Sequence, residues 1–315
     1  MKEKKFISVV VYLHNAGDSI RTFLETVISL CKARFEEFEI VCVNDASTDA
    51  TVEELKEYLA QNPAGAMVNV IHMSFYQGLE AAMNAGRDIA IGDFVYEFDT
   101  TEVDYEPELM MEVYEKLLAG NDIVAARSNG SVRLTSKLFY ALYNRTSYAK
   151  GKIGPETFRL ISRRAINRIK SMGQYIPYRK AVYNNCGLNM ATVTYESTGK
   201  CGKKKKAAAA ERTGLAMDSF IYFTNALERV SAVISGLFLL LTVGMGIWLV
   251  ADFFNADKPV EGWLSTMGFL ALGFFGVFVL LTIILKYLSV LLNLVFKQQR
   301  YLIADIEKVV NPNEH

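Results

Sequence analysis

Three clusters of polar residues each follow a segment that is typical of a buried strand. They cover His14–Ser19, Asn44–Asp49 and Asp99–Asp104, and an apolar run precedes each one directly. In open α/β sheets, ligands bind at the carboxyl ends of the strands. Three polar clusters at strand ends therefore predict one binding site at a single edge of a sheet.

The third cluster contains carboxylates of the kind that hold Mg²⁺ or Mn²⁺, which prefer hard oxygen ligands and bridge to substrate phosphates. The candidate metal ligands are Asp99, Glu102 and Asp104. A metal held there would neutralise a diphosphate leaving group. The alternative is an acidic loop whose carboxylates lie near the N-terminus of the next helix and complement its dipole.

The second cluster begins with Asn44 and Asp45, at the end of a predicted strand. A carboxylate in this position can accept hydrogen bonds from a nucleobase or a ribose, so Asp45 is a candidate ligand-binding residue. Asp49 precedes a helical pattern by two residues, and we interpret it as part of the helix cap.

The elements that position these clusters alternate along the chain. Such alternation predicts an α/β fold with a mostly parallel sheet covered on both faces. Strands are predicted at Ile7–Leu13, Glu39–Val43, Met67–His72, Phe94–Phe98, Asp122–Ala126, Thr157–Ile161 and Met190–Tyr195. Helices are predicted at Ile20–Cys31, Thr51–Leu59, Gly78–Ile91, Pro107–Leu118, Ser136–Tyr148 and Arg163–Ile169. Apart from its last strand, the segment Ile176–Tyr195 is predicted to be irregular.

Two apolar runs near the end of the chain predict a membrane-spanning hairpin. Val230–Ala251 and Trp263–Leu285 each reach the ~20 residues that a bilayer requires. Basic residues flank the pair, whereas the loop Asp252–Gly262 is mainly acidic, so the positive-inside rule places both termini in the cytosol. This predicts a multi-pass protein of the plasma membrane. The alternative is a pair of buried core helices.

The predicted organisation has three parts: a cytosolic domain over 1–228, the hairpin over 229–286, and a C-terminal part over 287–315. The apolar pattern after Lys286 predicts an exit helix and tail that lie along the membrane interface or pack against a neighbouring subunit, which is compatible with a homo-oligomer. The net charge of zero gives no general attraction to nucleic acid. The four cysteines lack metal-ligand spacing and are predicted to be reduced thiols.

Four segments, in this order, resemble the family 2 glycosyltransferases with the GT-A fold. Val43–Thr51 is similar to the family's VDDGSTDGT signature, Gly78–Gly86 to its G-x-x-A-A-x-x-A-G helix, Ala90–Asp93 to A-x-G-D, and Phe158–Arg164 to F-R-L-x-x-R-R. With two apolar spans behind them, these segments resemble the polyisoprenyl-phosphate glycosyltransferases, relatives of dolichol-phosphate mannose synthase. The resemblance covers nearly the whole chain.

The resemblance implies transfer of a sugar from a nucleotide-sugar donor to a polyprenyl (undecaprenyl-type) phosphate at the cytosolic leaflet, for synthesis of cell-envelope glycans. It implies that Asp45 binds the base, with His14 and Asn15 beside it, and that Asp99 binds the metal and diphosphate. Arg159 is then expected on a phosphate as a catalytic residue together with Asp99. Two basic residues near the predicted helix Ser136–Tyr148 are the candidates for the lipid phosphate: Arg133 and Lys137.

Several positions depart from the family pattern. The family's glutamate in the first loop is Ala16, the first aspartate of VDD is Asn44, an Arg-Asn pair is Phe75-Tyr76, the second aspartate of the DxD motif is Thr101, and the aspartate before F-R-L is Thr157. Two alternatives follow. Beside transfer to a polyprenyl phosphate, the chain could be a GT-A-fold membrane protein that has lost its chemistry and acts as a scaffold for envelope-polysaccharide enzymes, or a transferase with another lipid-linked acceptor.

Overall fold

A computed structural model describes residues 2–130, 141, 154, 156–172, 178–198, scattered residues within 233–247, 262–296 and 301–310. The chain divides into two compact units. The first comprises residues 1–216 together with 298–315, and the second comprises residues 217–297. The first unit contains the predicted strand-end clusters.

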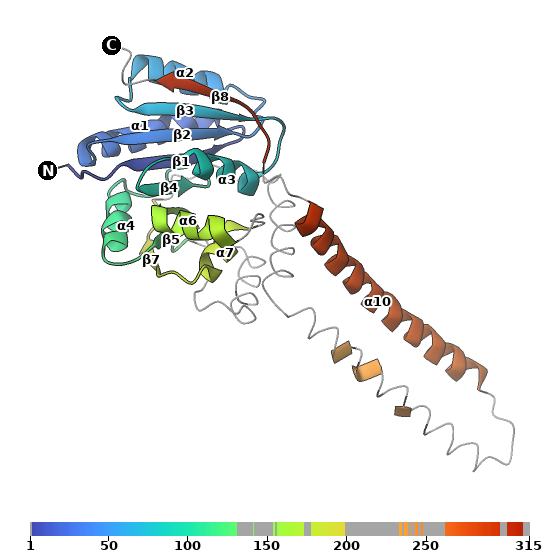
Figure 1. Ribbon diagram of the computed structural model, residues 1–315. Helices are drawn as coiled ribbons and strands as arrows, with labels where there is room; N and C mark the ends of the chain where they lie inside the picture. Colours follow the sequence, from blue (N-terminus) through green and yellow to red (C-terminus); the bar gives the residue numbers. More distant parts are fainter. Residues whose placement is uncertain are drawn as a thin grey trace, which may run out of the picture. The chain divides into compact units, whose positions relative to one another are not determined.

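Within the described residues, the first unit is built on one eight-stranded sheet with the order β7-β5-β6-β4-β1-β2-β3-β8 (Figure 1). β1, β2, β3 and β4 form a parallel centre, whereas β6 and β8 run antiparallel to their neighbours. The bounds are β1 Ile7–Leu13, β2 Phe38–Asn44, β3 Met67–Met73, β4 Phe94–Phe98, β5 Ile123–Ser128, β6 Glu156–Ser162, β7 Met190–Tyr195 and β8 Ile303–Val310.

Helices cover both faces of the parallel centre. Their bounds are α1 Gly17–Arg34, α2 Thr51–Gln61, α3 Leu79–Ile89, α4 Leu109–Leu118, α6 Arg163–Met172 and α7 Arg179–Asn185. Alternate residues of a strand point to opposite faces. Val9 and Val11 of β1 accordingly belong to the core cluster that contains Phe23 of α1, whereas Val10 faces α3. The predicted α/β fold with a mostly parallel sheet is confirmed.

A glycine allows α3 to lie close to the sheet. A Cβ atom at Gly86 would come within 2.4 Å of Val10 and 2.6 Å of Val43, closer than atoms can approach. The small residue therefore sets the distance between α3 and strands β1 and β2. This contact explains in physical terms why the G-x-x-A-A-x-x-A-G pattern ends in glycine.

Two segments differ from the sequence-based expectations. Residues 176–189 were expected to be irregular, but α7 occupies Arg179–Asn185. An interfacial exit helix and tail were expected over 287–315, but Ile303–Val310 form the edge strand β8, antiparallel to β3. The alternation of apolar and charged residues in IADIEKVV has the period of a strand, so the helical expectation for these residues was wrong. The predicted helix Ser136–Tyr148 lies almost entirely outside the described residues.

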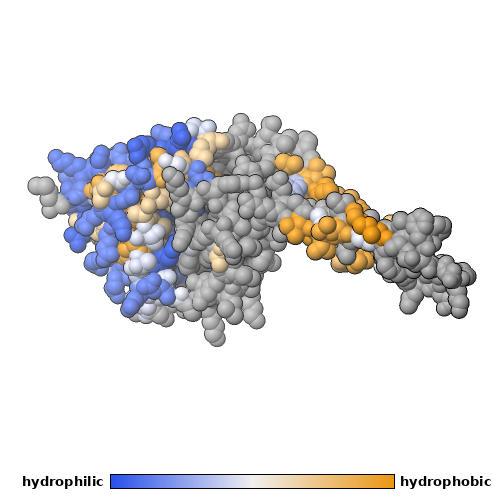
Figure 2. Space-filling view, turned by 90° about the horizontal axis from the view of Figure 1, so that it is seen from below, coloured by the Kyte–Doolittle hydropathy of each residue, from blue (hydrophilic) through white to orange (hydrophobic). Residues whose placement is uncertain are grey.

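The second unit contains a long apolar helix, α10, at Trp263–Phe296. Its stretch Gly268–Leu288 is the one candidate membrane span among the described residues, by length and composition. Hydrophobic residues cover the described part of this helix in Figure 2, whereas the described surface of the first unit is mainly hydrophilic. The predicted span Trp263–Leu285 is therefore helical, and most of the predicted span Val230–Ala251 lies outside the described residues.

The position of β8 leads to a first prediction. Deletion of residues 301–315 removes the strand that pairs with β3 from Val68 to Met73, so backbone groups of β3 lose their partners. A loss of about 2 kcal/mol would lower the melting temperature of a domain of this size by roughly 4–8 °C. Thermal unfolding of the detergent-solubilised chain, followed by circular dichroism, measures the change.

Deletion of only the five residues after β8, 311–315, is the matched control and should leave the melting temperature unchanged. Equal melting temperatures for the longer deletion and the full chain would contradict the role of β8 as an integral strand.

Candidate functional site

The loops that follow β1, β2 and β4 are joined by direct hydrogen bonds. The backbone N–H of Asn15 donates to the Ser47 hydroxyl at 3.1 Å, and the Thr48 N–H donates to the Asn15 side-chain oxygen at 2.9 Å. The hydroxyls of Ser19 and Thr101 lie 2.5 Å apart. The structure thus brings the three predicted polar clusters together at one edge of the sheet.

Asp45 is buried at this edge and holds the start of α3. Its carboxylate accepts hydrogen bonds from the backbone N–H groups of Gln77 and Gly78, both at 2.8 Å, and from the Tyr12 hydroxyl at 3.1 Å. Gly78 has φ of +86°, a conformation that glycine adopts without strain. Burial raises the pKa of Asp45, and these hydrogen bonds counteract part of that rise. The carboxylate predicted to bind the base thus also anchors the loop 74–78.

A more accessible surface lies beside Asp45. The His14 ring bonds through Nδ1 to the carbonyl of Asp45 at 2.7 Å, and its centroid is 4.6 Å from that of the Tyr76 ring. Tyr76 is 46% exposed. The two rings provide a surface on which a planar ring can stack.

The C-terminal strand is connected to the Asp45 loop through Gln77. The Gln77 amide donates to the Leu302 carbonyl at 2.6 Å and accepts from the Leu302 N–H at 2.8 Å. The Ser74 N–H also donates to the Leu302 carbonyl, at 3.1 Å. Residues more than 220 positions apart in sequence therefore fix the same loop.

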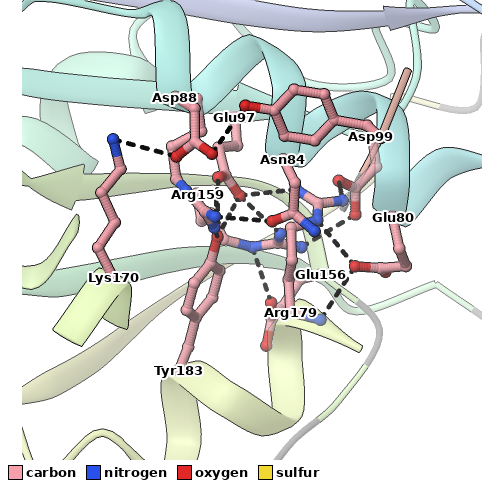
Figure 3. A network of polar contacts seen from close by, with 12 residues as sticks. Glu80, Asn84, Asp88, Glu97, Asp99, Glu156, Arg159, Lys170, Arg179 and Tyr183 are labelled. Carbon is pink, nitrogen blue, oxygen red and sulfur yellow. Dashed lines mark hydrogen bonds and ion pairs between the residues drawn. The ribbon is translucent and has the colours of Figure 1, made fainter. Parts of the chain in front are cut away.

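Asp99 lies in a buried network of carboxylates and guanidinium groups (Figure 3). One of its oxygens accepts from Arg159 at 2.9 Å, and the other accepts from Arg179 at 2.8 Å. The same two arginines reach Glu97, on β4, at 3.1 and 2.7 Å. Two guanidinium groups thus each bridge Glu97 and Asp99.

The rest of the network surrounds Glu97 and the two arginines. Arg159 also pairs with Glu156 at 3.3 Å, and Arg179 pairs with Glu80 at 2.9 Å. The Tyr183 hydroxyl donates to Glu97 at 2.8 Å and accepts from Arg87 at 2.9 Å. Strands β4 and β6 and helices α3 and α7 all contribute side chains, so the network joins two neighbouring strands to two helices.

The two arginines control the charge of Asp99. Burial by itself would raise the pKa of this carboxyl group, but the positive charges of Arg159 and Arg179 hold it well below its usual range. Asp99 is therefore ionised throughout the range in which enzymes work.

The predicted metal ligands do not converge. Asp104 accepts hydrogen bonds from the Tyr195 hydroxyl at 2.8 Å and the Ser197 hydroxyl at 3.0 Å. Both Asp99 oxygens already accept from arginines, and no group of three metal-ligating side chains occurs in the described part of the chain. Asp99, Glu102 and Asp104 therefore do not fit a divalent-cation site in this arrangement.

The remaining predicted residues have different outcomes. Arg159 was expected on a phosphate, but its side chain is 1% exposed and its donors point to three carboxylates. Arg133 and Lys137 lie outside the described residues. The sequence analysis missed Arg179, because it lies in a segment expected to be irregular, and Glu97, although a charged residue within the apolar run Phe94–Phe98 is a signal that could have identified it.

Comparison with known proteins assigns the family. The model of "Glycosyl transferase family 2" matches residues 8–170. A bactoprenol glucosyl transferase of Shigella phage SfX is 30% identical over 83% of this chain and 86% of its own. An uncharacterized glycosyltransferase of Synechocystis is 26% identical over 95% of both chains.

Solved structures agree with this assignment at the level of the fold. The mannosyltransferase PcManGT of Pyrobaculum calidifontis, in complex with GDP-Man and Mn²⁺, is similar with a TM-score of 0.53 and 14% identity, over 94% of this chain and 89% of its own. The fold is that of a GT-A-like glycosyltransferase. The chain belongs to glycosyl transferase family 2.

The buried network gives a second prediction. Arg179→Met removes the partner of Glu80, Glu97 and Asp99 and leaves buried carboxylates without compensation. Loss of one partner of a buried ion pair typically lowers the free energy of unfolding by about 3–5 kcal/mol. Urea unfolding followed by circular dichroism measures this loss.

Arg21→Met is the matched control, because Arg21 pairs with Glu54 and Glu57 on the surface. Its loss should lower the free energy of unfolding far less than the loss of Arg179 does. Similar losses in both variants would show that the network does not carry the stability assigned to it.

The low pKa of Asp99 gives a third prediction. As the pH falls through about 3.9, the unfolded chain takes up a proton at this position before the folded chain does, so stability is present above that pH and is lost below it. Asp99→Asn should therefore have a shallower decrease in the free energy of unfolding between pH 5 and pH 3, measured by urea titration at each pH. Parallel curves for the two proteins would contradict the ion pairing of Asp99.

Proposed function

We propose that this glycosyltransferase transfers a sugar from a nucleotide-sugar donor to a polyprenyl phosphate. The observation that carries the proposal is the joining of the three strand-end loops at one edge of a family 2 sheet. This edge is where open α/β folds bind ligands. The names of the bactoprenol glucosyl transferase relatives support the choice of acceptor.

The donor's nucleoside is proposed to bind at the loops after β1 and β2. The rings of His14 and Tyr76 offer a stacking surface, and Asn15 and Asp45 lie next to it. Asp45 acts here through the loop that it holds, because its carboxylate is buried and already accepts three hydrogen bonds. The diphosphate then extends toward the end of β4, where Asp99 lies.

The reaction requires positioning more than proton transfer. An oxygen of the lipid phosphate attacks the anomeric carbon, the bond from that carbon to the nucleoside diphosphate breaks, and the nucleoside diphosphate leaves with the electron pair. The attacking oxygen is already ionised, so it needs little help from a general base. Alignment of the two substrates and stabilisation of the leaving charge supply most of the rate.

The apolar segments are proposed to hold the enzyme at the membrane that contains its acceptor. α10 is long and apolar enough to span a bilayer, and the sequence predicts a partner span at Val230–Ala251. Arg133 and Lys137 remain candidates for the lipid phosphate. The charges flanking the hairpin favour a cytosolic catalytic domain, with both termini on the same side.

The fourth prediction tests this function. Membranes that contain the full chain are incubated with undecaprenyl phosphate and labelled UDP-glucose, UDP-galactose, UDP-N-acetylglucosamine or GDP-mannose. One donor is expected to yield a labelled, solvent-extractable lipid. Tyr76→Ala should raise the KM for that donor about tenfold, the effect of losing one stacking contact.

Phe75→Ala is the matched control, since Phe75 is an exposed aromatic neighbour for which the structure gives no ring contact with His14. Its KM should stay within about twofold of that of the unchanged protein. Absence of product with every donor, while a bactoprenol glucosyl transferase prepared in the same way is active, would overturn the proposal and favour the scaffold alternative.

A further inference from the structure

We propose that Asp99 binds no divalent cation, because Arg159 and Arg179 permanently neutralise it, and that Lys180 is the cation that meets the donor's diphosphate. The second half of this inference rests on the proposed function, because it assumes a nucleoside diphosphate donor. The first half concerns Asp99 alone and is tested separately.

Asp99 already has a charged partner on each of its carboxylate oxygens. Each carboxylate oxygen accepts a charge-assisted hydrogen bond, at 2.9 Å from Arg159 and 2.8 Å from Arg179. Such bonds are among the strong ones in proteins. A cation that took these oxygens would have to displace both guanidinium groups.

These guanidinium groups cannot move away easily. Arg159 is held by Glu97 and Glu156 as well, and Arg179 by Glu80 and Glu97. Both side chains are buried, and a guanidinium does not lose its proton in a protein. A divalent cation at Asp99 would therefore lie beside two fixed positive charges in a poorly screened environment.

Thr101 and Asp104, the neighbours that could replace a metal ligand, are engaged by other residues. Thr101 occupies the place of the second DxD aspartate, and its hydroxyl pairs with that of Ser19 at 2.5 Å. Asp104 is committed to Tyr195 and Ser197. Within the described residues, no group of three His, Cys, Asp or Glu side chains that could hold a metal ion forms around Asp99.

The arginines of the buried network do not balance all of its carboxylates. The network contains the carboxylates of Glu80, Glu97, Asp99 and Glu156 against the guanidinium groups of Arg87, Arg159 and Arg179, so one negative charge is unbalanced. Lys180 follows Arg179 on α7 and is only partly buried. Its ammonium lies near the carbonyl of Glu156, at 3.5 Å, and contributes to the low pKa of Asp99.

In this position Lys180 can contact a phosphate group, which the buried arginines cannot reach. A phosphate needs a donor that it can reach from solvent, and an ammonium presents three donors on a flexible stem. Lys180 meets both conditions, because it is partly exposed, follows Arg179 on α7, and has its ammonium 3.5 Å from the Glu156 carbonyl.

The fifth prediction is tested in two arms on the full-length protein in detergent. In the first arm, Mn²⁺ is added in equimolar amount and the electron paramagnetic resonance signal of free Mn²⁺ is measured. The signal is expected to match that of buffer with detergent. If the protein diminishes the signal and Asp99→Asn and Asp104→Asn restore it, the inference is overturned. If the protein diminishes the signal and neither substitution restores it, the ion binds elsewhere and Asp99 holds no metal, as inferred.

In the second arm, the Kd values of UDP, GDP and the matching nucleosides are measured by calorimetry in EDTA. One of the two nucleoside diphosphates is expected to bind without a metal. Lys180→Met should raise its Kd about tenfold and leave the Kd of the matching nucleoside unchanged. Lys116→Met is the matched control, because Lys116 is exposed on α4 and donates to the Thr192 carbonyl. An unchanged Kd in Lys180→Met, or binding of the diphosphate only with Mn²⁺, overturns the assignment.

The two arms separate the two proposals. Failure of all nucleotides to bind, with or without Mn²⁺, would overturn the proposed donor and with it the role of Lys180. The resonance signal would still decide whether Asp99 holds a metal.

Discussion

The ion pairs that join Glu97 and Asp99 to Arg159 and Arg179 are the interaction on which the rest of the site depends. Glu97 is fully buried on the central strand β4, where an uncompensated carboxylate would be very costly. Its neutralisation requires side chains from β6 and α7, and Glu80 on α3 then orients Arg179. The position of α7 over the sheet is thus specified by charge as well as by apolar packing.

Removing one partner from such a network is costly, but the intact network is weak evidence of a gain in net stability. Desolvation of buried ions offsets much of their mutual attraction, and apolar side chains of similar volume often stabilise a fold as well or better. The benefit of ions lies in their geometry, because each guanidinium must meet three carboxylates in fixed directions. Here the ion pairs of Glu97 and Asp99 fix the carboxyl end of β4 to β6 and α7.

Much of the fold could be predicted from sequence because its signals are local. The bounds of β1, β4 and β7 agree with the predicted ranges, since each follows from an apolar run or from alternation with clear polar ends. β8 could not be assigned in this way. Its pairing with β3 joins segments more than 220 positions apart in sequence, and a short amphipathic segment that follows a long helix resembles a continuation of that helix.

The candidate site could be predicted only in outline, for a related reason. The position of Asp45 and Asp99 at strand ends follows from local pattern, but their accessibility depends on what other segments bring to them. Gln77 and Tyr12 enclose Asp45, and Arg159 and Arg179 enclose Asp99, although Arg179 lies 80 positions away in sequence. A carboxylate's chemical role is decided by such partners, which a motif does not contain.

The two enclosed aspartates show how these partners set different properties for the same side chain. Asp45 is bound mainly by neutral N–H and O–H groups, so burial dominates and its pKa rises, whereas two guanidinium groups lower that of Asp99. Asp45 therefore holds a loop through hydrogen bonds, whereas Asp99 forms ion pairs with two arginines. Because Gln77 connects the Asp45 loop to Leu302, that loop also depends on the segment that follows α10 in the chain. The edge of the sheet that carries Asp45 is consequently held in part by Leu302, which bonds to both Gln77 and Ser74.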